Sequence, residues 1–134
     1  MTDPVRELLT GARTIAVVGL SEDTSRPAYG VAQFLQQHGY RIVPVHPTAQ
    51  SVLGEKAYPT LTAAAGDHAI DIVDVFRRAD AVPSLVDEVL ALKLPALWLQ
   101  ETVVHEEAAR RARAAGVFVV MDKCILKEHR RLRI

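Results

Sequence analysis

The sequence is short of cysteine, of long apolar runs and of net charge. Its 134 residues include a single cysteine, Cys124, so no internal disulfide is possible, which fits a reducing compartment. No apolar run approaches the roughly 18 residues that cross a membrane, and the N-terminus lacks the apolar core of a secretion signal. Sixteen basic and sixteen acidic residues cancel, which removes the overall basic field typical of nucleic-acid binding. We therefore expect a cytoplasmic protein that binds neither membranes nor nucleic acid.

The sequence also lacks the short motifs of common catalytic and metal sites. It contains no nucleophile elbow, no P-loop lysine, and no histidine or cysteine pair at metal-ligand spacing, so His46 and His105 give little support for a metal. Cys124 and His129 would lie near one another on a helix, but no third group to orient a base is evident. The simpler interpretation of Cys124 is a half-buried thiol at the end of a strand.

What the sequence does contain is a regular alternation of strand and helix patterns. Five short runs rich in β-branched residues are typical of buried strands, at 15–18, 42–45, 70–76, 95–99 and 117–120. Helical spacing predicts a helix from Pro27 to His38, helices over 80–92 and 104–115, and short helices over 61–65 and near both ends of the chain. Residues 48–69 otherwise read as loop. The alternation predicts one α/β domain over residues 1–134, with three layers and a doubly wound, mainly parallel five-stranded sheet.

The loop after the first strand carries the clearest sign of a binding site. Gly19 allows a sharp turn, Pro27 suits the first position of a helix, and Ser25 could cap that helix. Unpaired N–H groups at a helix N-terminus suit a phosphate, and Arg26 can bond phosphate through two parallel donors. The dinucleotide motif G-x-G-x-x-G keeps only its first glycine, and no acidic residue follows the second strand. The loop therefore predicts a phosphate site and gives little support for NAD.

Polar residues follow each of the five strands, at the edge of the sheet where ligands bind in folds of this class. They are Gly19, Ser21, Ser25 and Arg26; His46 and Pro47; Arg77 and Arg78; Gln100 and Glu101; and Asp122, Lys123 and Cys124. The three arginines would repel one another unless an anion lay among them. The alternative is that the Arg77-Arg78 dipeptide only pairs on the surface with Asp74, Asp80 or a helix end. With many binding groups and no evident catalytic set, this edge predicts a binding module.

Six segments along the chain then form a pattern of their own. They are Val17–Ser21, Ser25–Ala32, Gly39–Pro47, Asp74–Arg78, Leu97–Gln100 and Val119–Cys124. In this order they resemble the small stand-alone CoA-binding domain family, a relative of the CoA-binding N-terminal domain of the succinyl-CoA synthetase α-subunit. The similarity extends from about Leu8 to His129. It implies a Rossmann-like fold and coenzyme A as the ligand.

The resemblance also implies where coenzyme A would lie. Its diphosphate would sit by the loop after the first strand, and its nucleotide and pantetheine arm would follow Pro47, Phe76 and Arg77, with Gln100 further along. The complete set expected to bind the ligand is Gly19, Leu20, Ser21, Ser25, Arg26, Pro27, Tyr29, His46, Pro47, Phe76, Arg77, Arg78, Gln100 and Lys123. Members of the family often have glycine shortly after the Gln100 position, where this chain has Glu101-Thr102.

Three functions stay open at this point. The first is a cytoplasmic protein that binds CoA or an acyl-CoA without catalysis, which fits a ligand with several phosphates and no need of an acidic residue after the second strand. The second is an enzyme that uses CoA or another nucleotide, with Cys124 or His46 in the reaction. The third is an NAD(P)-binding redox sensor on the same fold. The sequence identifies no acyl group, oligomeric state or protein partner.

Overall fold

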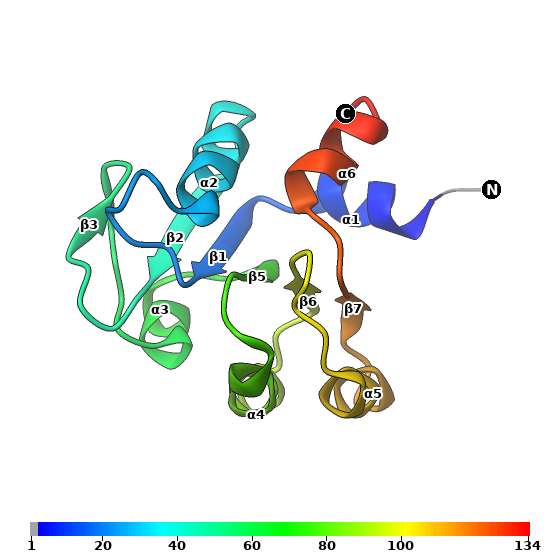
Figure 1. Cartoon of the computed structure of the whole chain (residues 1–134). Coiled ribbons are helices and arrows are strands. Elements are labelled where there is room, and N and C mark those ends of the chain that lie inside the picture. Colours follow the sequence, from blue (N-terminus) through cyan, green and yellow to red (C-terminus); the bar gives the residue numbers. More distant parts are fainter. Residues whose placement is uncertain (1–2) are drawn as a thin grey trace.

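A parallel five-stranded sheet lies at the centre of the chain. The computed structural model describes residues 3–134 (Figure 1). The strands of the sheet are β1 Thr14–Val18, β2 Arg41–Val45, β5 Ile72–Val75, β6 Ala96–Leu99 and β7 Phe118–Val120. They pair in the order β2-β1-β5-β6-β7, and every pair is parallel. The predicted doubly wound, Rossmann-like α/β sheet is confirmed.

Helices cover both faces of the sheet and complete three layers (Figure 1). One face carries α1 Pro4–Gly11, α2 Pro27–Gln37 and α6 Ile125–Arg131, and the other carries α3 Leu61–Asp67, α4 Val82–Ala91 and α5 Glu106–Ala114. Each face has its own apolar core. Trp98 is fully buried in the core on the face of α1, α2 and α6, and its indole Nε1 donates to the carbonyl of Lys123 at 2.8 Å. Within residues 3–134, no helix combines the length and the apolarity that a bilayer crossing requires.

Side chains that flank the helices account for where several of them begin. Asp3 Oδ1 accepts from the Val5 amide at 2.9 Å, and Thr60 Oγ1 accepts from the Ala63 amide at 3.0 Å. Each of these bonds satisfies one of the amides that a helix leaves unpaired at its start. At the other end of a helix, Gly116, with φ of +91°, follows the C-cap residue of α5 and turns the chain out of the helix.

The short elements differ from the sequence prediction. Residues 48–69, read as loop, contain a small antiparallel hairpin of β3 Ser51–Val52 and β4 Glu55–Lys56. Strands of two residues have no periodicity for a pattern to detect. The short helix predicted over 61–65 extends further, because α3 continues past Gly66 to Asp67. A turn of 3₁₀ helix, η1 Ala79–Ala81, precedes α4, whose first turn contains Pro83.

Candidate functional site

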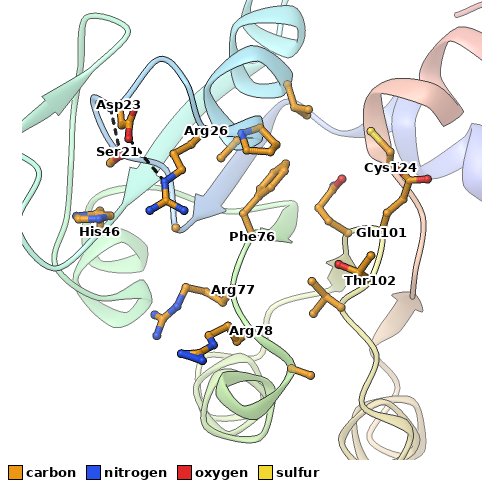
Figure 2. A pocket seen from close by; sticks show the side chains of 17 residues that line it. Ser21, Asp23, Arg26, His46, Phe76, Arg77, Arg78, Glu101, Thr102 and Cys124 are labelled. Carbon is orange, nitrogen blue, oxygen red and sulfur yellow. Dashed lines mark hydrogen bonds and ion pairs between the residues drawn. The ribbon is translucent and has the colours of Figure 1, made fainter.

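The carboxyl ends of the strands open into a cleft of about 800 Å³ (Figure 2). The segments that follow β1, β2, β5, β6 and β7 all contribute to it. The lining residues are Gly19, Ser21, Asp23, Arg26, Pro27, Ala28, Val31, His46, Phe76, Arg77, Arg78, Ala79, Gln100, Glu101, Thr102, Val103 and Cys124. The cleft therefore lies at the edge of the sheet where the sequence predicts a ligand.

Gly19 brings the loops after β1 and β5 into contact. Its φ is +96°, in the region that favours glycine, and its amide donates to the carbonyl of Val45 at 2.8 Å. A Cβ at this position would lie 2.3 Å from the carbonyl oxygen of Phe76. The absence of a side chain thus allows the backbone of β1 to pass directly beside the segment that carries Phe76 and Arg77.

The loop between β1 and α2 is organised by Asp23, which sequence reasoning did not select. Asp23 Oδ1 accepts from the backbone amide of Ser25 at 3.0 Å and from its hydroxyl at 2.6 Å, and Arg26 Nε lies 3.6 Å from Asp23 Oδ2. The Ser25 hydroxyl bond is the largest cause that lowers the pKa of Asp23, followed by the Ser25 amide, with a smaller contribution from Arg26. The signal available in the sequence was the aspartate itself, because in loops Asp commonly accepts a hydrogen bond from the backbone amide two residues further on, here that of Ser25.

Ser25 is therefore not the cap of α2, and that prediction is wrong. Its hydroxyl is turned toward Asp23, and Arg26 occupies the cap position with no side-chain bond to the helix amides. Pro27 takes the first helical position, as predicted. Pro27 and Ala28, in the first turn of α2, both line the cleft.

Three exposed arginines gather at one side of the cleft. Figure 2 shows Arg26, Arg77 and Arg78 facing the hollow together with His46. Among residues 3–134, no acidic group lies within 4.0 Å of the guanidinium of Arg77 or Arg78, whereas Arg26 has Asp23 beside it. Within the described residues, neither Asp74 nor Asp80 pairs with Arg77 or Arg78, and no side-chain hydrogen bond joins these two arginines to a helix end, so the alternative of surface pairing is wrong. This side of the cleft carries more positive than negative charge and suits an anion with several charged oxygens.

The ring of His46 is held in one orientation. Its Nδ1 accepts from the backbone amides of Thr48 and Ala49, each at 3.2 Å. Because Nδ1 is the acceptor, the ring proton belongs on Nε2, which leaves a neutral N–H donor for the cleft. His105 instead caps a helix, because its Nδ1 accepts from the Ala108 amide at the start of α5. The two histidines do not share a site.

A buried polar pair lies under the wall of the cleft. Gln100, which is 4% exposed, follows β6 directly, and its Nε2 donates to Oδ1 of Asp74 on β5. The side chain of Asp74 is fully buried. Burial raises the pKa of Asp74 to about 8, and the hydrogen bond from Gln100 opposes that rise. The two residues are 26 positions apart, so only the pairing of β5 with β6 reveals their contact.

The other side of the cleft carries Glu101, Thr102 and Cys124 (Figure 2). Glu101 accepts from Lys127 Nζ at 2.9 Å. The amide of Thr102, whose φ is +72°, donates to Asp122 Oδ1 at 2.7 Å. Two loops that follow neighbouring strands are thereby tied together at this side.

Cys124 and His129 do not form the pair that helical spacing allows. Cys124 is half-buried and lines the cleft. His129 is 3% exposed, lines a separate cavity at the opposite end of the sheet, and packs against the rings of Phe34, His38 and Tyr40. A nucleophile in the cleft would thus not have His129 as its base.

Most residues of the predicted set line the cleft, and some do not. Those that line it are Gly19, Ser21, Arg26, Pro27, His46, Phe76, Arg77, Arg78 and Gln100. Those outside the lining are Leu20, Ser25, Tyr29, Pro47 and Lys123. Leu20 is fully buried in the core, and Lys123 Nζ lies 3.8 Å from Glu128 Oε1 instead. The lining that was not predicted is largely apolar and includes Ala28, Val31 and Val103, which pattern reasoning assigns to packing.

Comparison with known proteins now identifies the family. A family model described as CoA binding domain matches residues 13–130. The chain belongs to the CoA-binding domain family. This confirms the resemblance predicted from the sequence. Family membership links the chain to coenzyme A as a small-molecule ligand.

Relatives of the chain include both stand-alone domains and parts of larger enzymes. The protein YneT of Bacillus subtilis (strain 168), itself uncharacterized, is 40% identical over 125 residues, which are 93% of this chain and 91% of YneT. The structure of a hypothetical protein from Pyrococcus horikoshii OT3 has a TM-score of 0.93 at 33% identity, covering 100% of this chain and 94% of that one. An acetate–CoA ligase (ADP-forming) II of Archaeoglobus fulgidus is 34% identical over 83 residues, which are 59% of this chain and 11% of the ligase.

Proposed function

We propose that the cleft binds coenzyme A or an acyl-CoA and that the chain does not itself catalyse a reaction. The observation that carries the proposal is the group of Arg26, Arg77 and Arg78 at the carboxyl edge of the sheet, two of them with no acidic partner among residues 3–134. Coenzyme A carries a diphosphate and a 3′-phosphate, so it can engage several cations at once. Membership of the CoA-binding domain family supports the same ligand.

The two sides of the cleft differ in a way that suits this molecule. In the proposed arrangement, the phosphates contact the arginines, and the Nε2–H of His46 supplies an additional neutral donor. The uncharged pantetheine arm passes Phe76 and Gln100 toward Val103 and Cys124. Aliphatic and aromatic groups with a few polar atoms are the usual lining for such an arm.

The polar groups of the cleft also support binding rather than catalysis. The pKa of Asp23 is lowered by its bonds to Ser25, which makes it a weak base. Glu101 is engaged by Lys127, and Asp74 lies wholly beneath the surface. No carboxylate of the cleft among residues 3–134 is bonded to the ring of His46, so the nucleophile, base and orienting group of a covalent mechanism are not assembled.

Thermal unfolding with a panel of ligands tests the proposal. CoA, acetyl-CoA, dephospho-CoA, NAD and NADP are compared at equal concentration. A ligand at about a hundred times its Kd adds about 2.7 kcal/mol, a shift of about 10 °C for a domain of this size. We expect a shift with CoA that shrinks with dephospho-CoA. A shift with NAD or NADP and none with CoA would replace the proposal with the redox-sensor alternative.

Arg26→Ala locates the phosphate site. Removing a charged hydrogen-bond donor should weaken CoA binding by about 1–3 kcal/mol, measured by titration calorimetry. Arg41→Ala is the matched control, because Arg41 is an exposed arginine at the amino end of β2, away from the cleft, where it pairs with Glu55. Equal affinity in the Arg26 variant and the parent would show that the phosphates bind elsewhere.

A second candidate follows from the position of Cys124, whose half-buried thiol lines the cleft. In that case the chain is an enzyme that acts on a CoA-linked group through the thiol. CoA-dependent turnover that disappears in Cys124→Ser would establish it. A thiol that titrates at its ordinary pKa both with and without CoA, together with no turnover, would leave the binding function standing.

A further inference from the structure

Asp74 is a buried carboxyl group with an atom that has no partner. Within residues 3–134, its Oδ2 is buried and lacks any hydrogen bond. Its neighbours in register on the adjacent strands are Val17 on β1 and Trp98 on β6, both apolar in character and fully buried. Burying a polar group without full satisfaction is costly, so such a group in the middle of a sheet requires an explanation.

Asp74 is connected to the cleft by a hydrogen bond to a residue that lines it. Its other oxygen, Oδ1, accepts from Nε2 of Gln100, which lines the cleft directly after β6. Phe76, two residues beyond Asp74 on the same side of the chain, lines the cleft as well. Asp74 is thus one hydrogen bond away from the cleft surface and contacts it through Gln100.

The hydrogen bond determines which atom of Gln100 faces the ligand. The Nε2 group is turned inward to Asp74. Among residues 3–134, no group donates a hydrogen bond to Oε1 of Gln100. Oε1 is also not a fully buried atom, because the buried side-chain atom without a partner in this part of the chain is Asp74 Oδ2. Oε1 is therefore accessible, and the surface that Gln100 borders is the cleft. A neutral acceptor facing the cleft suits an N–H donor and disfavours a phosphate oxygen.

We propose that Asp74 is a positioning residue: it holds the Gln100 amide so that Oε1 accepts a hydrogen bond from an amide N–H in the uncharged arm of the ligand. This inference rests on the proposed function, because the pantetheine arm of CoA is what supplies the amide. The proposal gives the cleft two sides: the arginines bind the phosphates, and Gln100 binds an amide of the pantetheine arm.

The surroundings of Asp74 keep it compatible with an anionic ligand. Burial raises the pKa of Asp74 to about 8, so the carboxyl carries its proton at neutral pH and does not repel the phosphates. Of the three helices on this face, α2 contains no charged side chain, and its only titratable group is the Tyr29 phenol. The charged residues of α1 and α6 are not among the causes that shift the pKa of Asp74. β1 and β6 face it with Val17 and Trp98. Gln100 is the polar group that acts on Asp74.

Two ligands separate the amide contact from the phosphate contacts. Titration calorimetry compares CoA with adenosine 3′,5′-bisphosphate, which lacks the pantetheine arm. Gln100→Leu should weaken CoA binding about 3- to 10-fold and leave the bisphosphate unchanged, since one neutral hydrogen bond is lost. Asp74→Leu should have the same selective effect by releasing the Gln100 amide, and the double variant should be no weaker than Gln100→Leu alone.

Asp74→Asn is the conservative variant that separates positioning from folding. Its side-chain oxygen can still accept from Gln100, so CoA affinity should stay within about twofold of the parent. The inference is overturned if Gln100→Leu lowers the affinity for both ligands equally or for neither. It is also overturned if the losses of CoA affinity in the two leucine variants add in the double variant, or if Asp74→Asn loses affinity for CoA and keeps it for the bisphosphate. A parent protein that binds neither ligand would overturn the proposed function itself, which is a separate outcome.

Discussion

Gly19 is the residue on which the geometry of the cleft depends most directly. A Cβ at this position would lie 2.3 Å from the Phe76 carbonyl oxygen, and φ is +96°. Gly19→Ala should therefore lower the free energy of unfolding by about 2–4 kcal/mol, from left-handed strain together with displacement of the Phe76 backbone. Chemical unfolding measures this change.

Gly30 provides the matched control for Gly19. It lies inside α2 with ordinary φ, and a Cβ there would meet no atom within 4 Å. Gly30→Ala should raise stability by about 0.5–1 kcal/mol, because alanine loses less conformational freedom in a helix. Loss of stability in both variants to a similar degree would mean that the approach of Gly19 to Phe76 is not the cause.

The titration of Asp74 makes stability depend on pH. The ordinary pKa of 3.8 applies in the unfolded chain, whereas burial raises the pKa to about 8 in the folded chain. Between about pH 4 and 8 only the unfolded state releases the proton, so stability should fall as pH rises, by at most about 1.4 kcal/mol per pH unit. Chemical unfolding of the parent and of Asp74→Asn from pH 5 to 8.5 should show the asparagine variant gaining relative stability as pH increases. A difference that stays constant over this range would contradict the buried, protonated carboxyl.

At the scale of the element, the loops after β6 and β7 hold non-glycine residues in the left-handed region. Thr102 has φ of +72° and donates its amide to Asp122, which has φ of +61°. A β-branched residue is unfavourable there. Thr102→Gly should raise stability by about 0.5–1 kcal/mol net, after the greater freedom of glycine in the unfolded chain is subtracted.

Thr24 is a suitable comparison for Thr102. It is an exposed loop residue whose φ is not in the left-handed region. Thr24→Gly should lower the midpoint of thermal unfolding slightly, since only the entropic cost of glycine remains. If both glycine variants shift the midpoint in the same direction, strain at Thr102 is not what the substitution relieves.

The elements also show what a sequence can reveal. The strands β1 and β5 were predictable because each is a short, continuous run of mainly apolar residues, and α2 was predictable because its apolar residues recur at helical spacing. The order of those elements also predicted the edge of the sheet that carries the cleft. The hairpin β3–β4 was missed because two residues cannot display a period. The ends of helices differ from the prediction by one or two residues because the apolar period does not mark the residue at which a helix begins or ends.

Side-chain contacts set the limit of the site prediction. Serine is a residue type that often caps helices, but the hydroxyl of Ser25 bonds to Asp23 instead of to the amides of α2. A sequence pattern cannot tell which of the two partners the hydroxyl takes. The contact of Asp74 with Gln100 requires the register between β5 and β6, which no local signal contains. The arginines were predictable because they lie in the segments that connect β1 to α2 and β5 to α4, so the topology alone places them at one edge.

At the scale of the whole molecule, a chain with no net charge concentrates positive charge at one end of its sheet. Sixteen basic and sixteen acidic residues balance, yet Arg26, Arg77 and Arg78 face one cleft whose carboxylates are Asp23 and Glu101. Local attraction to an anion should then act over a few ångströms and be screened by salt. We expect CoA affinity to fall roughly tenfold between 50 and 500 mM NaCl.

The slope of that dependence, measured by calorimetry, identifies the groups responsible. Arg26→Ala should flatten the plot of affinity against salt, because one cation no longer contributes, whereas Arg41→Ala should leave the slope as it is in the parent. The unfolding midpoint of the unliganded protein should change far less over the same range, since exposed ion pairs such as that of Arg110 with Glu107 contribute little. An affinity that does not respond to salt would mean that CoA is held by its uncharged arm, and the arginines at this edge would then need another anion.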